Sequence, residues 1–187
     1  MKRYILLPIL FLISVSVFSN DSRVINLGNA VLLDKTTTNI QIIEESLDFY
    51  LHNKSFDAVV KYVYANNSDN VEELTLGFPI IATVQGYDLK NISVDNFKTV
   101  FNGEVVSDYT QKTEQTTDDD IYYRVTQWYI RKLKFKGNAL NHSTVSYSSS
   151  YSHSGFYQFA EYITGTANNW NGSIKKINIT IHIDKDI

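Results

Sequence analysis

The sequence predicts an all-β protein, an antiparallel two-sheet β-sandwich of immunoglobulin-like architecture. The chain has 187 residues, with 13 tyrosines, 10 phenylalanines and many valines, isoleucines and threonines, the residue types that fit a pleated surface. Several stretches alternate apolar and polar residues with a period of two, which is typical of strands with one buried face. Only two prolines occur, and no proline-rich linker divides the chain.

The first residues, MKRYILLPILFLISVSVFSN, predict a signal peptide. Lys2 and Arg3 form a basic start, and residues 4–17 form an apolar run shorter than the about 20 residues that a membrane span needs. Val17 and Ser19 suit the positions that a signal peptidase reads. We expect cleavage after Ser19, and an uncleaved N-terminal anchor is the alternative.

Removal of residues 1–19 leaves residues 20–187 as a single exported β-sandwich domain, either periplasmic or extracellular. The chain has no cysteine, which excludes disulfides, thiolate metal sites and cysteine nucleophiles. Its net charge of −3 becomes more negative without the two basic residues of the signal peptide. Because no basic block occurs, we expect no nucleic-acid partner. We also expect no stable membrane span after cleavage.

The first strand signal of this domain is TNIQIIEESLDFYLHN, residues 38–53. A helix is the alternative, but the apolar residues alternate at Ile40 and Ile42 and again at Leu47, Phe49 and Leu51. This alternation favours paired strands.

Two further stretches, FDAVVKYVYANNSD and VEELTLGFPI, predict a hairpin or a sheet corner. Residues 66–69 supply turn-forming side chains between them. Pro79 lacks an amide proton and is expected to end its strand. From the parity of all the strands we expect a core that includes Val60, Tyr62, Leu74, Leu76, Phe78, Ile179 and Ile181.

The second half of the chain has three more alternating stretches, IYYRVTQWYIRKLKF, STVSYSSSYSHS and INITIHI, and the last alternates most regularly. Three segments are less regular. Asp95–Asn102 is expected to form a short helix or a turn, and Ser107–Asp120 a polar loop. Helix and strand are equally supported for Gly155–Ile163.

Trp170 lies in a run of small polar residues, TGTANNWNGS. We expect it to fold back over the open end of the sandwich, because burial removes roughly 200 Å² of apolar surface from water. Its indole N–H then requires a carbonyl partner. An exposed platform that stacks on a ligand is the alternative.

Several blocks resemble a secreted bacterial family, domain of unknown function 4424. The first block contains Glu44-Glu45, Leu47 and the Phe78-Pro79 pair. The last resembles the family's Thr-Gly-x-x-Trp-x-Gly-x-Ile block and ends at Ile174. The family usually has Phe-Pro-x-Pro, whereas isoleucines follow Pro79 here. The resemblance implies an exported β-sandwich without assigned activity, and it transfers no catalytic residue.

No motif in the chain predicts catalysis, a metal or a cofactor. The four histidines, at positions 52, 142, 153 and 182, lack any ligand spacing. There is no G-x-S-x-G elbow. The adjacent aspartates Asp118, Asp119 and Asp120 lack the alternate spacing and the glycine of a calcium loop.

Three functional hypotheses follow. The first is a non-catalytic binding or structural module of the bacterial envelope, which contacts an envelope protein through a sheet edge or end loops. The second is a carbohydrate-binding module that stacks sugars on Trp128, Tyr147, Tyr151 and Trp170. The third, which has least support, is a hydrolase that uses His142 or His153 with a nearby carboxylate.

Overall fold

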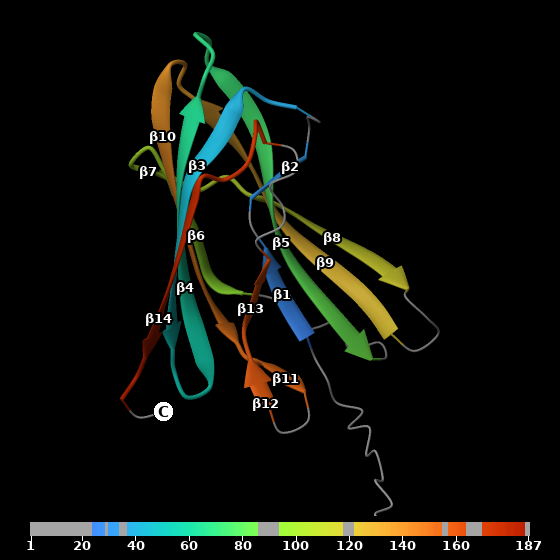
Figure 1. Cartoon of the computed structure of the whole chain (residues 1–187). Helices are drawn as coiled ribbons and strands as arrows, with labels where there is room; N and C mark the ends of the chain where they lie inside the picture. The colour runs from blue at the N-terminus through green and yellow to red at the C-terminus, as the bar shows by residue number, and fades with distance from the viewer. Residues whose placement is uncertain are drawn as a thin grey trace, which may run out of the picture.

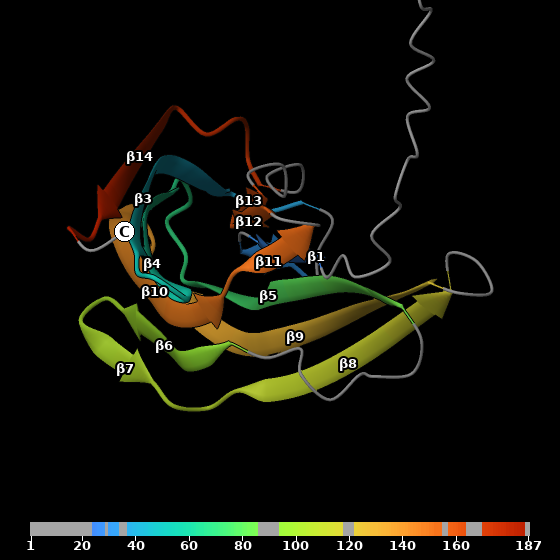
Figure 2. The same ribbon diagram turned by 90° about the horizontal axis from the view of Figure 1, so that it is seen from below.

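The structure is a computed structural model, and it describes residues 24–28, 30–33, 37–85, 94–117, 122–154, 157–163 and 170–185. Within these ranges all regular elements are strands, and two sheets pack together (Figures 1 and 2). The predicted all-β sandwich is therefore confirmed, while its immunoglobulin-like arrangement stays a prediction. The predicted signal peptide lies outside the described residues.

The β5–β9 sheet contains, in order, β13 (Glu161–Ile163), β1 (Val24–Gly28), β5 (Glu72–Gln85), β9 (Tyr122–Phe135) and β8 (Thr110–Thr117), and β2 (Val31–Leu32) also pairs with β5. The β3–β4 sheet contains, in order, β14 (Lys176–Ile183), β3 (Ile40–Leu51), β4 (Ser55–Asn66), β10 (Ala139–Ser150), β6 (Asp95–Phe101) and β7 (Glu104–Val106). β11 (Ser152–Ser154) and β12 (Tyr157–Phe159) form a separate ribbon. The pairs are antiparallel as predicted, except that β14 runs parallel to β3 and β13 parallel to β1.

The core lies between β4 and β5, as the alternation predicts. Val60 and Tyr62 of β4 and Leu74, Leu76 and Phe78 of β5 are all buried. The two strands belong to different sheets. The turn between them is therefore a sheet corner and not a hairpin. The Asn66 side chain shapes this corner, because it accepts a hydrogen bond from the Ser68 amide and donates one to the Asn70 carbonyl.

A bulge in β3 explains why its apolar residues are even-numbered up to Ile42 and odd-numbered from Leu47. Ile42 pairs with Tyr64, and Glu44 pairs with the next residue, Val63, so that one residue of β3 is extra. Such a bulge moves the following side chains to the other parity. Ile42 and Leu47 therefore both face the core from one continuous strand.

The expectation that Pro79 ends its strand and the expectation that Ile179 and Ile181 are buried are both wrong. β5 continues past Pro79 to Gln85. Pro79 lies between Gly77, which pairs with β2, and Ile80, which pairs with β1, so the residue without an amide proton lies where the partner strand changes. Ile179 and Ile181 were expected in the core but are 55% and 59% exposed. β14 is an edge strand, and its apolar side continues beyond the part of the sheet that the other layer covers.

The three irregular segments also form strands. Asp95–Asn102 contains β6, where Thr99 and Phe101 are buried against the core. The expected loop Ser107–Asp120 contains β8, whose polar residues pair with β9 over eight positions at the edge of the sheet. An exposed edge strand needs no apolar face, which is why its sequence resembles a loop. Gly155–Ile163 contains β12 and β13.

Trp170 is buried, as predicted, with 5% of its surface exposed. Its ring lies 5.2 Å from that of Tyr64 and 6.4 Å from that of Phe135, which belong to opposite sheets. The indole N–H donates to the Ala30 carbonyl at 3.3 Å, which is the kind of partner that burial requires. Trp170 therefore links both sheets at one end of the sandwich.

Candidate binding edge and its polar end

The exposed side of β14 forms a row of four isoleucines, Ile177, Ile179, Ile181 and Ile183, which we call the isoleucine edge. Their register explains why they share one side. Ile179 pairs with Leu47 and Ile181 with Phe49, both of which are buried residues of β3. Paired residues on neighbouring strands project to the same face of a sheet. The isoleucine edge therefore extends the inner, apolar face of the β3–β4 sheet.

The isoleucine edge is exposed along its full length. From Ile177 to Ile183 the exposed fractions of the four side chains are 43%, 55%, 59% and 65%. Single exposed apolar residues are ordinary on a protein surface, whereas a contiguous exposed apolar row is a candidate interaction site. β14 lies at the outer margin of the molecule in both ribbon views (Figures 1 and 2).

The opposite side of β14 is polar and is satisfied within the protein. Lys176 forms an ion pair with Glu44 at 3.0 Å, and Asn178 donates to the same carboxylate at 3.1 Å. His182 contacts Asp48 at 3.2 Å and stacks on the Tyr50 ring at 4.4 Å. These contacts stabilise the pairing of β14 with β3. They leave the isoleucines, and the backbone groups on the far side of the strand, as the features that a partner would use.

A shallow hollow adjoins the isoleucine edge. It is lined by Phe49, Leu51, Tyr151, Phe159, Ala160 and Ile181, together with Gln158, and its volume is about 210 Å³. Sites for small-molecule ligands usually enclose roughly 300–1,000 Å³. The hollow is therefore suited to a single apolar side chain of a partner and is too small for most metabolites.

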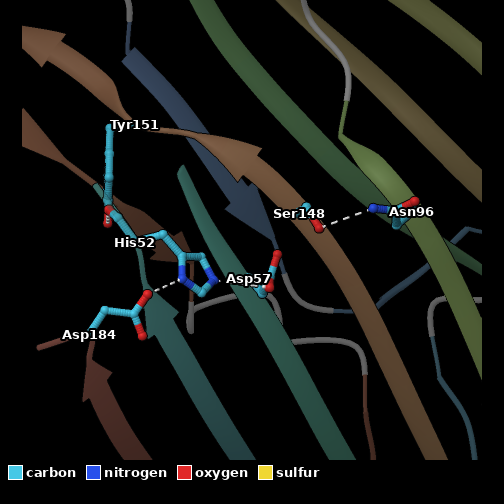
Figure 3. A network of polar contacts seen from close by, with 6 residues as sticks. All are labelled: His52, Asp57, Asn96, Ser148, Tyr151 and Asp184. Carbon is cyan, nitrogen blue, oxygen red and sulfur yellow. Dashed lines mark hydrogen bonds and ion pairs between the residues drawn. The ribbon is translucent and has the colours of Figure 1, made fainter. Parts of the chain in front are cut away.

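A polar network lies at the end of β14 (Figure 3). His52, in the turn between β3 and β4, contacts two carboxylates. Its Nδ1 lies 2.6 Å from Asp184, which follows β14, and its Nε2 lies 3.1 Å from Asp57 of β4. The Tyr151 hydroxyl donates to the His52 carbonyl at 2.8 Å and joins this network to the hollow. The network thus ties the end of the edge strand to the rest of its sheet.

The electrostatics of this network favour a charged histidine. Hydrogen bonds from its ring to Asp184 and then to Asp57 raise the pKa of His52 above its ordinary value. The hydrogen bond with the Ser148 side chain has the largest effect on Asp57 and lowers its pKa, and the hydrogen bond with His52 lowers it further. When the ring is protonated, both nitrogens donate to these carboxylates, and neither is free to act as a general base. His52 therefore forms an ion-paired network with Asp57 and Asp184.

The four residues predicted to contact a ligand do not come together. Tyr147 and Trp170 are buried, at 2% and 5% exposure, so neither can stack on a sugar. Trp128 is half-buried on β9, and its indole N–H donates to Glu114 at 3.1 Å. Tyr151 is half-buried and lines the hollow. Only Tyr151 lies at the site described here.

Sequence reasoning missed both parts of this site. It assigned Ile179 and Ile181 to the core, although the lysines at positions 175, 176 and 185 that flank the strand are typical of an edge. No sequence signal joins His52 to Asp184, which are 132 positions apart. Among the described residues, no group of three or more His, Asp or Glu side chains is placed to hold a metal ion. No helix in that part of the chain is long and apolar enough to cross a membrane.

The fold and its edge define the class of protein as a two-sheet β-sandwich with an exposed edge strand. No protein-family model matches the chain, and comparison with curated proteins gives no match. Among solved structures, the chain is similar to the crystal structure of a "putative nutrient binding protein" from Legionella pneumophila, with 15% identity and a TM-score of 0.62. The match covers 82% of this chain and 53% of that protein, so this chain spans about half its length. At this identity the similarity shows the fold alone.

Proposed function

We propose that this chain is an exported, non-catalytic β-sandwich that binds an extended segment of a partner protein along β14, as a binding or structural module of the bacterial envelope. The observation that carries the proposal is the isoleucine edge, a row of exposed apolar side chains on a strand whose far side is an open sheet edge. An added strand gains backbone hydrogen bonds along such an edge, and its alternate side chains pack on the apolar side.

Further observations bear on the binding role, on export and on the alternative functions. The hollow accepts one apolar side chain next to Ile181. The similar Legionella protein is described as a binding protein, and the signal-peptide pattern and the family resemblance both favour export. Catalysis has less support, because the exposed histidine with the strongest carboxylate contacts has both nitrogens engaged. The carbohydrate hypothesis loses two of its four stacking residues to the core.

Site-specific photocrosslinking tests the binding edge. A photoreactive residue replaces Ile179 on β14 in cells that export the protein, and the matched control replaces Thr113, an exposed residue on the β8 edge of the other sheet. We expect a discrete adduct from position 179 and none from position 113. Equal labelling from both positions, or no adduct from position 179, would contradict the proposal.

Export is tested separately. Mature protein recovered from the envelope or the medium should begin at Asn20, because Val17 and Ser19 suit signal peptidase. N-terminal sequencing that returns Met1 from the exported fraction would refute cleavage. Recovery of the protein from the cytoplasm alone would refute export.

A further inference from the structure

The sequence of the edge strand has an internal symmetry. From Lys176 to Asp184 it is Lys-Ile-Asn-Ile-Thr-Ile-His-Ile-Asp, centred on Thr180. Residues equally far from Thr180 on either side are identical, alike or complementary: isoleucine with isoleucine, polar asparagine with polar histidine, and lysine with the oppositely charged aspartate. A strand that pairs with its own copy about a twofold axis requires this property, because residue i then contacts residue j and residue j contacts residue i.

From this symmetry we propose that β14 pairs antiparallel with β14 of a second copy of this chain, with Thr180 opposite Thr180. The inference rests on the proposed function, because it names the strand that binds at the same edge. In this register Ile177 lies opposite Ile183, and Ile179 opposite Ile181, on the apolar side. On the polar side Asn178 lies opposite His182. The two six-stranded sheets then join into one continuous sheet.

The charges agree with this register. Lys176 lies opposite Asp184 of the second copy. Within each chain Lys176 already contacts Glu44, and Asp184 already contacts His52. Pairing therefore creates a row across the interface in which Glu44, Lys176, Asp184 and His52 alternate in sign. Alternating charges in neighbouring cross-strand positions are favourable, whereas like charges would oppose the contact.

The flanking lysines oppose other registers. A shift by one residue would place isoleucines opposite polar residues on the wrong face of the strand. A shift by two residues would place Ile183 opposite Lys175, or Ile177 opposite Lys185. Only the register centred on Thr180 pairs all four isoleucines. Since one strand pair gives a small interface, we expect a dimer that dissociates on dilution.

Engineered cysteines test the register, and the natural chain contains none that would interfere. Residues 20–187 carrying Thr180→Cys should form a disulfide-linked dimer under mild oxidation, because directly opposed Cα atoms lie about 4.5–5.5 Å apart. Asn178→Cys is the matched control on the same face. Its copies lie roughly 13 Å apart in this register, four residues along the strand, so it should form no disulfide-linked dimer. A mixture of Asn178→Cys and His182→Cys should cross-link.

Light scattering over a range of concentrations tests the dimer itself. The unmodified protein should approach twice its monomer mass at high concentration, and Ile179→Lys combined with Ile181→Lys should stay monomeric, because the new charges face each other. Thr113→Lys with Gln115→Lys on the β8 edge is the control and should dimerise normally. Unchanged circular dichroism and melting of each variant would exclude misfolding.

Two results would overturn the inference: a monomer at every concentration, or equal cross-linking of Thr180→Cys and Asn178→Cys. A monomer that still gives an adduct with a different protein from position 179 would refute the second copy and leave the binding edge intact. A monomer without any adduct would refute both.

Discussion

The Trp170 side chain closes one end of the sandwich, because it contacts Tyr64 of one sheet and Phe135 of the other. Its burial also orders the approach to β14, since the Asn171 amide donates to the Ile40 carbonyl next to it. A residue with this position acts on stability and not on ligand contact.

Trp170→Ala should therefore lower the free energy of unfolding by about 3–5 kcal/mol, the range for large aromatic residues removed from packed sites. Denaturant unfolding measures this loss. The other tryptophan, Trp128, lies half-exposed on β9 and stays as a spectroscopic control. An unchanged melting temperature, with long-wavelength emission from Trp170 in the unmodified protein, would refute the packing role.

His52 gives the second prediction at the scale of single residues. Its pKa is raised in the folded protein, so its contribution to stability is fully present below its unfolded pKa near 6.5 and is lost as the pH rises through the folded value. Asp57 acts in the opposite sense. Its pKa is lowered, so its contribution is present above about 3.8 and is lost as the pH falls through the folded value.

The stability difference between the unmodified protein and His52→Gln should thus be largest between pH 3.8 and pH 6.5 and should decrease in alkaline solution. Thermal melts across this range measure the difference. His142→Gln, a substitution at an exposed histidine of β10, is the matched control. A difference that grows above neutral pH would refute the stabilising ion pairs of His52 with Asp57 and Asp184.

At the scale of the strands, β5 and β14 both alternate apolar and polar residues but have opposite environments. A period of two identifies which side chains share a face, and this suffices for β3, β4 and β5, which lie inside their sheets. It does not identify whether a second layer covers that face. The exposure of the isoleucines of β14 was therefore not predicted. Polar β8 was missed because its pairing with β9 leaves no apolar signal. The His52 network could not be predicted, because only the strand order brings residues 52 and 184 together.

Matched truncations separate the two environments. Leu76→Ala in β5 should cost about 2–5 kcal/mol, because it removes a fully buried side chain and leaves a cavity. Ile181→Ala in β14 should change stability by less than about 0.5 kcal/mol in dilute solution, since the side chain is already exposed. Denaturant unfolding of both variants measures these values. Equal losses would mean that β14 is covered in solution by another part of the chain.

At the scale of the whole molecule, each of the two sheets carries a buried charged side chain, Arg131 on β9 and Glu45 on β3. Arg131 of β9 is 2% exposed, and its Nε, Nη1 and Nη2 atoms have no hydrogen-bond partner among the described residues. Glu45 of β3 is fully buried on the opposite sheet and accepts a hydrogen bond from the Tyr162 hydroxyl at 2.8 Å. Burial is the largest cause that raises the pKa values of Tyr62 and Tyr64. Glu45 raises and Arg131 lowers both pKa values as well, so both tyrosines lie within the electrostatic range of both charges.

A double-mutant cycle tests whether Arg131 and Glu45 compensate each other across the core. If the two charges compensate each other, Arg131→Met alone and Glu45→Gln alone should each destabilise the protein, because each would leave the other charge buried and uncompensated. The double variant should be more stable than the sum of the single losses predicts, with a coupling of about 0.5–3 kcal/mol. Urea unfolding at neutral pH measures all four proteins. Additive losses would show that the two charges act independently, and that the sheets are held together by apolar packing alone.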